Sequence, residues 1–316
     1  MIDVRGVTKR YGEKVAVDDL TFQVRPGIVT GFLGPNGAGK STTMRLILGL
    51  DAPTSGEVSI DGRVYRDLPA PLHEVGAMLE AHAIHTGRSA YNHLLALAQT
   101  HGIARTRVQE VIELVGLAEV ARKRVGSFSL GMGQRLGVAS ALLGDPATVI
   151  LDEPANGLDP EGIHWIRTLL KRLASEGRTV FLSSHLMSEM AQTADHLIVV
   201  GRGRLIADTS VEDFVRRASS DAAVRVRSPE AGELEAVLRG QGVDVARLGE
   251  DQLEVTGLGG RQIGEAALQA RIVLSELTPQ QASLEQAFIS LTGESVEYRG
   301  GDAAAQDDAE PIGVAA

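Results

Sequence analysis

Apolar positions near the start of the chain alternate with polar ones, and they later follow a helical period. The alternation runs through residues 1–30, with a turn at Arg25-Pro26-Gly27, and returns from Gly56 to Ile60. Between Ser89 and Leu143 apolar side chains recur three and four positions apart instead. The pattern predicts N-terminal antiparallel strands followed by a helical insertion.

Short apolar runs return after this helical segment. They lie at residues 148–151, 179–183 and 196–200, and a helix is indicated over 160–176 because Gly177 follows it. The first run is uninterrupted, as expected for a parallel strand that is covered on both faces. We therefore expect an α/β domain over residues 1–215 with a parallel-sheet core and a helical subdomain at about 85–145.

Residues 216–300 predict a second, smaller α+β domain. The strands are expected around Val224, Val243, Leu253 and 272–274, and the helices at 233–238, 263–270 and 284–291. The first six of these elements have the order of a ferredoxin-like unit. Residues 301–316 contain four acidic residues and no Lys or Arg, so we expect a disordered acidic tail.

Composition narrows the classes of protein that fit. The 316 residues are 43% apolar, which suits a well-buried core, and no apolar run reaches the 18 residues of a membrane span. Because Met1-Ile2-Asp3-Val4-Arg5 already alternates like a strand, we expect no secretory signal. The absence of cysteine excludes disulfides and suits a reducing compartment. A net charge of −10 argues against general binding of nucleic acid.

The run Gly34-Pro35-Asn36-Gly37-Ala38-Gly39-Lys40-Ser41 is the strongest chemical signal in the chain. It matches the phosphate-loop pattern G-x-x-x-x-G-K-[ST], and it lies between an apolar strand-like stretch and a helical one. The glycines allow the backbone to approach phosphates closely. Lys40 would reach the β- and γ-phosphates, and the Ser41 hydroxyl would ligate Mg²⁺. The chain is predicted to bind a nucleoside triphosphate.

Two further features support such a site. Asp152 and Glu153 follow the apolar strand at 148–151, where the first carboxylate suits Mg²⁺ and the second suits orienting or deprotonating water. Ser129 and Gly131 open an apolar helix, whose start attracts anions. Alone, the acids would also fit a solvated strand end, and Ser129 an ordinary helix cap. The phosphate loop upstream favours the functional interpretation.

A further motif lies between the phosphate loop and the two acids, namely Phe128-Ser129-Leu130-Gly131-Met132. Together with this motif, residues 2–215 resemble the nucleotide-binding subunit of an ATP-binding cassette (ABC) transporter. In that family these five positions are the signature motif, usually Leu-Ser-Gly-Gly-Gln. Leu130 replaces the first glycine and Met132 the glutamine, whereas Ser129 and Gly131 are kept. The resemblance implies a P-loop NTPase fold of the ABC type that binds ATP and Mg²⁺.

The resemblance also implies a role for each matching residue. Gly34 through Thr42 would hold the phosphates, with Asp152 as the metal-associated acid and Glu153 as the catalytic base. Glu80 stands where the family usually has glutamine. The resemblance therefore implies that Glu80 contacts the metal ion, and its carboxylate would add a negative charge beside the triphosphate. The remaining positions are Tyr11 stacking on adenine, Asp159 in the loop Asn156-Gly157-Leu158-Asp159 where two subunits touch, and His185 contacting the γ-phosphate.

At the level of function, the resemblance implies an ATPase that works as a pair of cassettes, either a homodimer or a paralogous heterodimer. ATP would join the two, and hydrolysis would drive a separate transmembrane permease at the cytoplasmic face of the membrane. The residues from Leu79 to Ala90 and from Ser283 to Phe288 resemble daunorubicin- and bacitracin-type resistance proteins, which implies multidrug or antibiotic export.

Two other interpretations compete with this one. A soluble ABC ATPase of translation or DNA repair would carry two cassettes with a charged linker, or a long coiled-coil insertion, and this chain shows one cassette with neither feature. A P-loop kinase or GTPase would explain neither Ser129 nor His185. Both fit the sequence less well than a transporter subunit.

Overall fold

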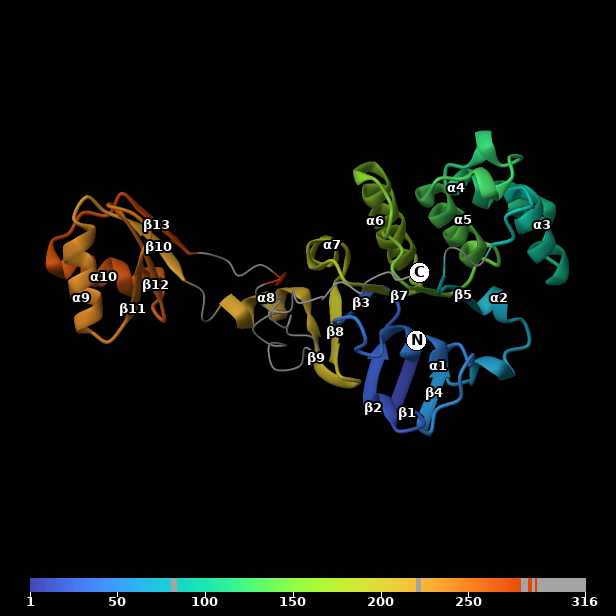
Figure 1. Ribbon diagram of the computed structural model, residues 1–316, viewed down its shortest axis with the longest axis horizontal. Coiled ribbons are helices and arrows are strands. Elements are labelled where there is room, and N and C mark those ends of the chain that lie inside the picture. Colours follow the sequence, from blue (N-terminus) through green and yellow to red (C-terminus); the bar gives the residue numbers. More distant parts are fainter. Residues whose placement is uncertain (81–83, 220–222, 280–283, 286–287, 289–316) are drawn as a thin grey trace, which may run out of the picture.

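The computed structural model describes residues 1–80, 84–219, 223–279, 284–285 and 288 (Figure 1). The predicted acidic tail and most of the predicted helix at 284–291 lie outside these residues. Within the described part of the chain, no helix is both long enough and apolar enough to cross a lipid bilayer.

A six-stranded sheet forms the centre of the cassette. Its strands, in spatial order, are β5 (Val75–Met78), β6 (Thr148–Leu151), β7 (Thr179–Ser184), β3 (Val29–Leu33), β8 (His196–Gly201) and β9 (Arg204–Ser210). All neighbours are parallel except β8 and β9. β3, β6 and β7 are buried along their whole length, as is typical of parallel strands that are covered on both faces. The parallel-sheet core is confirmed.

The N-terminal strands form a separate antiparallel sheet, drawn in blue in Figure 1. Its order is β2 (Lys14–Val24), β1 (Ile2–Tyr11) and β4 (Ser55–Ile60). Phe22 of this sheet lies 5.6 Å from Phe32 and 5.9 Å from Phe181 of the central sheet, measured between ring centroids. Such tilted aromatic contacts bury large apolar surfaces. Helix α1 (Lys40–Ile47) contributes Met44 to the same buried cluster.

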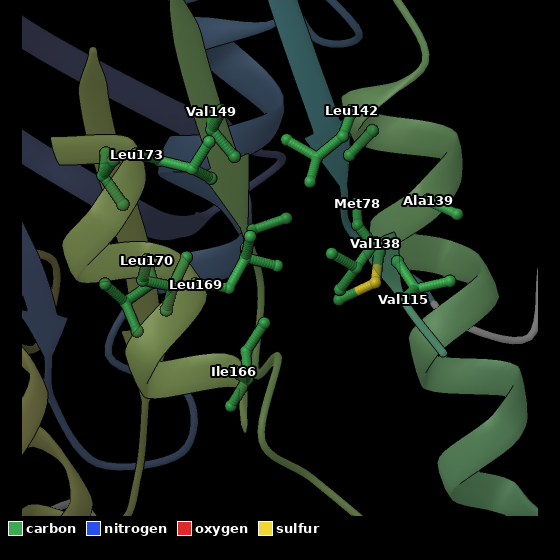
Figure 2. Packing of buried hydrophobic residues seen from close by; sticks show 14 of the residues in the cluster. Met78, Val115, Val138, Ala139, Leu142, Val149, Ile166, Leu169, Leu170 and Leu173 are labelled. Carbon is green, nitrogen blue, oxygen red and sulfur yellow. The ribbon is translucent and has the colours of Figure 1, made fainter. Parts of the chain in front are cut away.

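Helices cover the other face of the central sheet. α5 (Leu130–Leu142) packs on β5 and β6, and α6 (Pro160–Ser175) and α7 (Met187–Thr193) pack on β3 and β7. α3 (Ala90–Thr100) and α4 (Arg105–Leu114) pack on α5. The shorter elements are α2 (Pro71–Glu74), next to β5, and 3₁₀ turns at Tyr65–Asp67, Ala118–Val120 and Val125–Ser127. Figure 2 shows Val138 and Leu142 of α5 facing Leu169 and Leu173 of α6 across Val149. The predicted helical insertion is confirmed by α3, α4 and α5.

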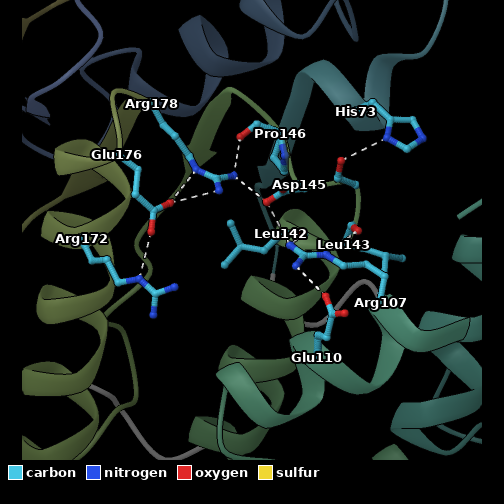
Figure 3. Close-up of polar contacts among 11 residues, drawn as sticks. His73, Arg107, Glu110, Leu142, Leu143, Asp145, Pro146, Arg172, Glu176 and Arg178 are labelled. Atoms are coloured by element: carbon cyan, nitrogen blue, oxygen red, sulfur yellow. Dashed lines mark hydrogen bonds and ion pairs between the residues drawn. The ribbon is translucent and has the colours of Figure 1, made fainter. Parts of the chain in front are cut away.

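Helix α5 is anchored at its carboxyl end by a polar network (Figure 3). Arg107 of α4 donates to the Leu142 carbonyl oxygen at 2.9 Å and lies 3.2 Å from Asp145. Asp145 also pairs with Arg178, at 2.9 Å, next to the start of β7. Cations at a helix carboxyl end satisfy its free carbonyls. The network therefore joins the helical subdomain to the central sheet.

A second unit with its own core follows α8 (Val211–Ser219). Its elements are β10 (Val224–Arg227), α9 (Ala231–Gly240), β11 (Asp244–Arg247), β12 (Gln252–Thr256), α10 (Gly260–Ala270) and β13 (Glu276–Pro279). The sheet is antiparallel with the order β11-β12-β10-β13. This is the order of a split βαβ unit, in agreement with the predicted sequence of elements.

The last strand of this unit was predicted at the wrong place. Residues 272–274 are not a strand, because the Ile272 N–H donates to the Ala267 carbonyl oxygen at 2.9 Å and completes the end of α10. Val273 is 64% exposed, and the strand begins at Glu276. Further along, Leu284 and Phe288 are buried in the core cluster that also contains Phe214 of α8 and the helices of the cassette.

Candidate active site

The phosphate loop runs from the carboxyl end of β3 to α1, and two of its glycines have no room for a side chain. A Cβ on Gly34 would lie 2.4 Å from the Val200 carbonyl oxygen. Gly39 adopts a φ of +99°, and its Cβ would lie 2.5 Å from the Ala16 carbonyl oxygen. These constraints fix the loop at the start of α1, where free N–H groups favour anions.

Lys40 lies within this loop and is 8% exposed. Its Nζ donates to the carbonyl oxygens of Gly34 at 2.6 Å and Pro35 at 3.3 Å. Burial lowers the pKa of Lys40, and the nearby Glu153 and Asp152 carboxylates oppose that shift. The cation is thus held where the loop, the helix start and two acids converge.

A cavity of about 440 Å³ opens over the loop. It is lined by Tyr11, Lys14, Ala16, the residues from Asn36 to Thr42, Asp152 and Glu153. Residues far apart in the sequence therefore meet at one cavity of the size of a small-molecule site. Ser41 and Asp152 both line it, and their oxygen atoms are of the kind that Mg²⁺ prefers. Glu80, Ser129, Gly131, Asp159 and His185 do not line it.

The two acids follow β6 and are held by Ser183 of β7. Ser183 Oγ donates a short hydrogen bond to Asp152 Oδ1 and accepts one from the Glu153 N–H at 3.0 Å. Glu153 has a φ of +50°, a left-handed conformation that is uncommon outside glycine. The turn after β6 therefore points both carboxylates to the cavity over the phosphate loop.

His185 lies directly beside Glu153. Its Nδ1 is 2.7 Å from Glu153 Oε2, and its backbone N–H donates to the same oxygen at 3.3 Å. Both side chains are partly accessible, at 45% and 26% of their surface. A carboxylate paired with an imidazole beside a phosphate cradle is suited to orienting and deprotonating a water molecule.

Tyr11 stands at the rim of the cavity and is 47% exposed. Its hydroxyl donates to Asp51 Oδ2 at 2.9 Å, and Lys9 Nζ lies 4.8 Å from the ring centroid. Arg45 also donates to Asp51, and the Arg45 and Tyr11 hydrogen bonds lower the pKa of that carboxyl. The ring is therefore fixed at its polar end while part of its face stays accessible.

The signature segment lies at the amino end of α5. Ser129 caps this helix, because its Oγ accepts from the Met132 N–H at 3.3 Å. Leu130, which replaces the glycine typical of the family, is 48% exposed and packs over Gly157. A Cβ on Gly157 would lie 2.1 Å from Leu130 Cδ2. The Leu130 substitution is therefore accommodated by a glycine in the loop after Glu153.

Asp159 and Glu80 occupy other positions. Asp159 caps α6, where its Oδ1 accepts from the Gly162 N–H at 2.8 Å. Glu80 is exposed just after β5. The hydrogen bond to Asp51 raises the pKa of Arg45, and the Glu80 charge adds to that shift. A metal contact at Glu80 stays a prediction.

Gln134, Ser183 and Glu189 also lie at or near the site, although no sequence motif gives them a role. Gln134 of α5 donates to the Glu153 carbonyl oxygen at 2.9 Å, and Ser183 is fully buried. Glu189 Oε2 is buried and has no hydrogen-bond partner among the described residues. The one sequence signal for these residues is that they lie close to the signature segment or to His185 along the chain.

Comparison with known proteins agrees with this geometry. The model of the ABC transporter family matches residues 17–156, and that of a domain of unknown function (DUF8746) matches residues 222–285. An uncharacterized ABC transporter ATP-binding protein, YhcH of Bacillus subtilis strain 168, is 35% identical over 305 residues, which cover 94% of this chain and 97% of the relative.

Two more specific relatives are informative. The bacitracin transport ATP-binding protein BcrA of Bacillus licheniformis is 42% identical over 220 residues, 69% of this chain and 72% of that protein. The dimeric, post-hydrolysis structure of the ATP-binding cassette MJ0796 bound to ADP and Pi is 26% identical, with a TM-score of 0.61, and covers 67% of this chain and 99% of that one. This chain therefore belongs to the ABC transporter family, as one of its ATP-binding and ATP-hydrolysing subunits.

Proposed function

We propose that this chain powers the export of an antibiotic, a drug or a similar amphiphile. The observation that carries the proposal is the 42% identity to a bacitracin transport ATP-binding protein over the cassette. The cargo would pass through a separate membrane permease, with the chain bound peripherally at the cytoplasmic face. A role in translation or DNA repair has no counterpart among the relatives named above.

In the proposed reaction, the phosphate loop and Lys40 hold the triphosphate of ATP, and Tyr11 supports the adenine ring. Glu153 accepts the proton of the attacking water, and His185 holds the Glu153 carboxylate in place and reaches the γ-phosphate. Support comes from the 2.7 Å contact between these two side chains and from Glu153 lining the cavity.

Mg²⁺ fits the oxygen atoms of Ser41 and Asp152, which line the same cavity. When bound, the ion would neutralise charge on the phosphates. Ser183 orients Asp152 toward this position through its hydrogen bond. Glu80 is proposed as a further oxygen ligand.

A second cassette is part of the proposal. Ser129 and Gly131 lie outside the cavity of their own chain, so they are free to contact ATP held by a partner. Asp159 lies in the loop where the cassettes would touch, and the dimeric MJ0796 structure supports such pairing. The partner would be a second copy of this chain or a paralogue.

Transport in vesicles tests the direction and the cargo. The chain and the membrane protein that copurifies with it are placed in inside-out membrane vesicles, with labelled bacitracin as the probe. We expect ATP-dependent accumulation in these vesicles, and none with Glu153→Gln. Accumulation only in right-side-out vesicles would mean import, and copurification with ribosomes or DNA in place of a membrane protein would also overturn the proposal.

A further inference from the structure

The backbone of Glu153 is held on both sides by side chains from two different elements. Its N–H donates to Ser183 Oγ of β7 at 3.0 Å. Its carbonyl oxygen accepts from Gln134 Nε2 of α5 at 2.9 Å and from the Asn156 N–H at 3.1 Å. Ser183 is 0% exposed and Gln134 is 4% exposed, so water does not compete for either contact.

These contacts act on a backbone that needs support. A φ of +50° is rare for a residue with a Cβ, and it persists where the surroundings enforce it. The two backbone groups of Glu153 lie one on each side of the rotatable bonds that set the direction of its side chain. Fixing both therefore fixes the direction in which the Glu153 side chain leaves the backbone.

From this geometry we infer that Ser183 and Gln134 are positioning residues for the proposed base, Glu153. Neither side chain lines the cavity over the phosphate loop, so neither contacts ATP there. Gln134 acts through Glu153, and Ser183 acts through Glu153 and Asp152. The inference rests on the proposed role of Glu153.

Gln134 links this position to α5, the helix that Ser129 caps. The helix is fixed at its other end, because Arg107 and Asp145 hold the Leu142 end as Figure 3 shows. Helix α5 is therefore held in place at its carboxyl end. Because the Gln134 amide joins α5 to the Glu153 backbone, the position of the helix helps to set the position of Glu153. The alignment of the base depends on the signature helix of the same chain.

Steady-state kinetics of three single variants of the full chain test the inference. Gln134→Met keeps the length of the side chain and removes the donor, and Ser183→Ala removes the hydroxyl. We expect each to lower kcat about 30-fold, because small misplacements of a reacting group are costly. For Gln134→Met, the KM for ATP and the Kd for ATP should change less than about twofold, since the cavity lining and its contacts are intact.

The control is Thr179→Val. Thr179 is a buried hydroxyl residue on the same strand as Ser183, at its opposite end, where it accepts from the N-terminal ammonium at 3.1 Å. We expect this variant to keep the wild-type kcat. Gln134→Met is the cleaner of the two test variants, because Ser183 also contacts Asp152. It also keeps the test decisive if Ser183→Ala does not fold.

A mutant cycle separates positioning from general structural damage. In a Glu153→Gln background, Gln134→Met should leave the residual turnover unchanged, because the base that it positions is already gone. Wild-type kcat in Gln134→Met, or a further 30-fold loss in the double variant, would overturn the inference. Full turnover in Glu153→Gln alone would instead contradict the proposed function, so the two failures are distinguishable.

Discussion

His185 Nδ1 lies 2.7 Å from Glu153 Oε2, although the two residues are 32 positions apart in the sequence. β6 and β7 are adjacent parallel strands, so their carboxyl ends bring the turn after each strand to the same edge of the sheet. The imidazole therefore contacts the carboxylate that we propose as the base.

His185→Ala is expected to lower ATP turnover about 100-fold, because the carboxylate loses the partner that holds it. ATP affinity should change only a few-fold, because the phosphate loop and Lys40 still line the cavity and hold the triphosphate. Steady-state hydrolysis and equilibrium nucleotide binding measure the two effects. His101→Ala, at the exposed end of α3, is the control. Unchanged turnover in His185→Ala would contradict the role of the pair.

Gly39→Ala is expected to weaken ATP binding by about tenfold or more, because the new Cβ would meet the Ala16 carbonyl oxygen at 2.5 Å and deform the loop. Gly102→Ala is the matched control. Gly102 also has a positive φ, of +67°, but its Cβ would have no heavy atom within 4 Å. That variant should lose about 1 kcal/mol of stability and bind ATP normally. Equal ATP affinities in the two variants would refute the steric argument.

Tyr11 allows its ring and its hydroxyl to be tested separately. Tyr11→Ala should weaken ATP binding about tenfold, which is typical of a lost stacking contact. Tyr11→Phe removes only the hydrogen bond to Asp51 and should bind ATP within about twofold of the wild type. Calorimetric titration with ATP measures both. If the phenylalanine variant lost as much affinity as the alanine variant, stacking would not be the contribution of this residue.

Local patterns in the sequence predicted most of the cassette. The phosphate loop is specified by eight consecutive residues, because its function depends on backbone conformations that Gly34 and Gly39 permit. The buried strand β6 is marked in the sequence by the continuous apolar run Val149-Ile150-Leu151. The domain boundaries near residues 215 and 300 stay predictions.

Structural features that depend on residues far away in the sequence are harder to predict from local sequence patterns. β9 is a strand because it pairs with β8, and its own burial is only partial, so its sequence carries a weak signal. Residues 272–274 are apolar like a strand, yet they complete the end of α10. The contacts of Gln134 and Ser183 with Glu153 span 19 and 30 positions, and no local pattern marks them.

Glu189 gives a prediction about pH. Burial raises the pKa of Glu189, with the Glu153 charge adding to the shift and His185 opposing it. The folded protein therefore holds the Glu189 proton to a higher pH than the unfolded chain, and stability falls as pH rises through that window. At pH 7.5, Glu189→Gln should be more stable than the wild type, because the glutamine carries no charge to desolvate.

Urea unfolding at several pH values measures this effect. The advantage of Glu189→Gln should shrink below a pH of about 4, where the carboxyl is protonated in both states. Glu119→Gln, at an exposed position, is the control and should show no such trend. The role of burial would be contradicted if the stability of Glu189→Gln relative to the wild type were lower at pH 7.5 than at pH 4, since Glu189 Oε2 is buried with no hydrogen-bond partner among the described residues.

The most direct test of the account is the steady-state rate of ATP hydrolysis by Glu153→Gln. Glutamine has the shape of glutamate but cannot accept the proton of the attacking water. We predict that turnover falls at least about 100-fold while ATP binding persists and an ATP-bound dimer accumulates. A wild-type rate of hydrolysis in this variant would contradict the central claim that Glu153 is the base of an ATP-driven transporter subunit.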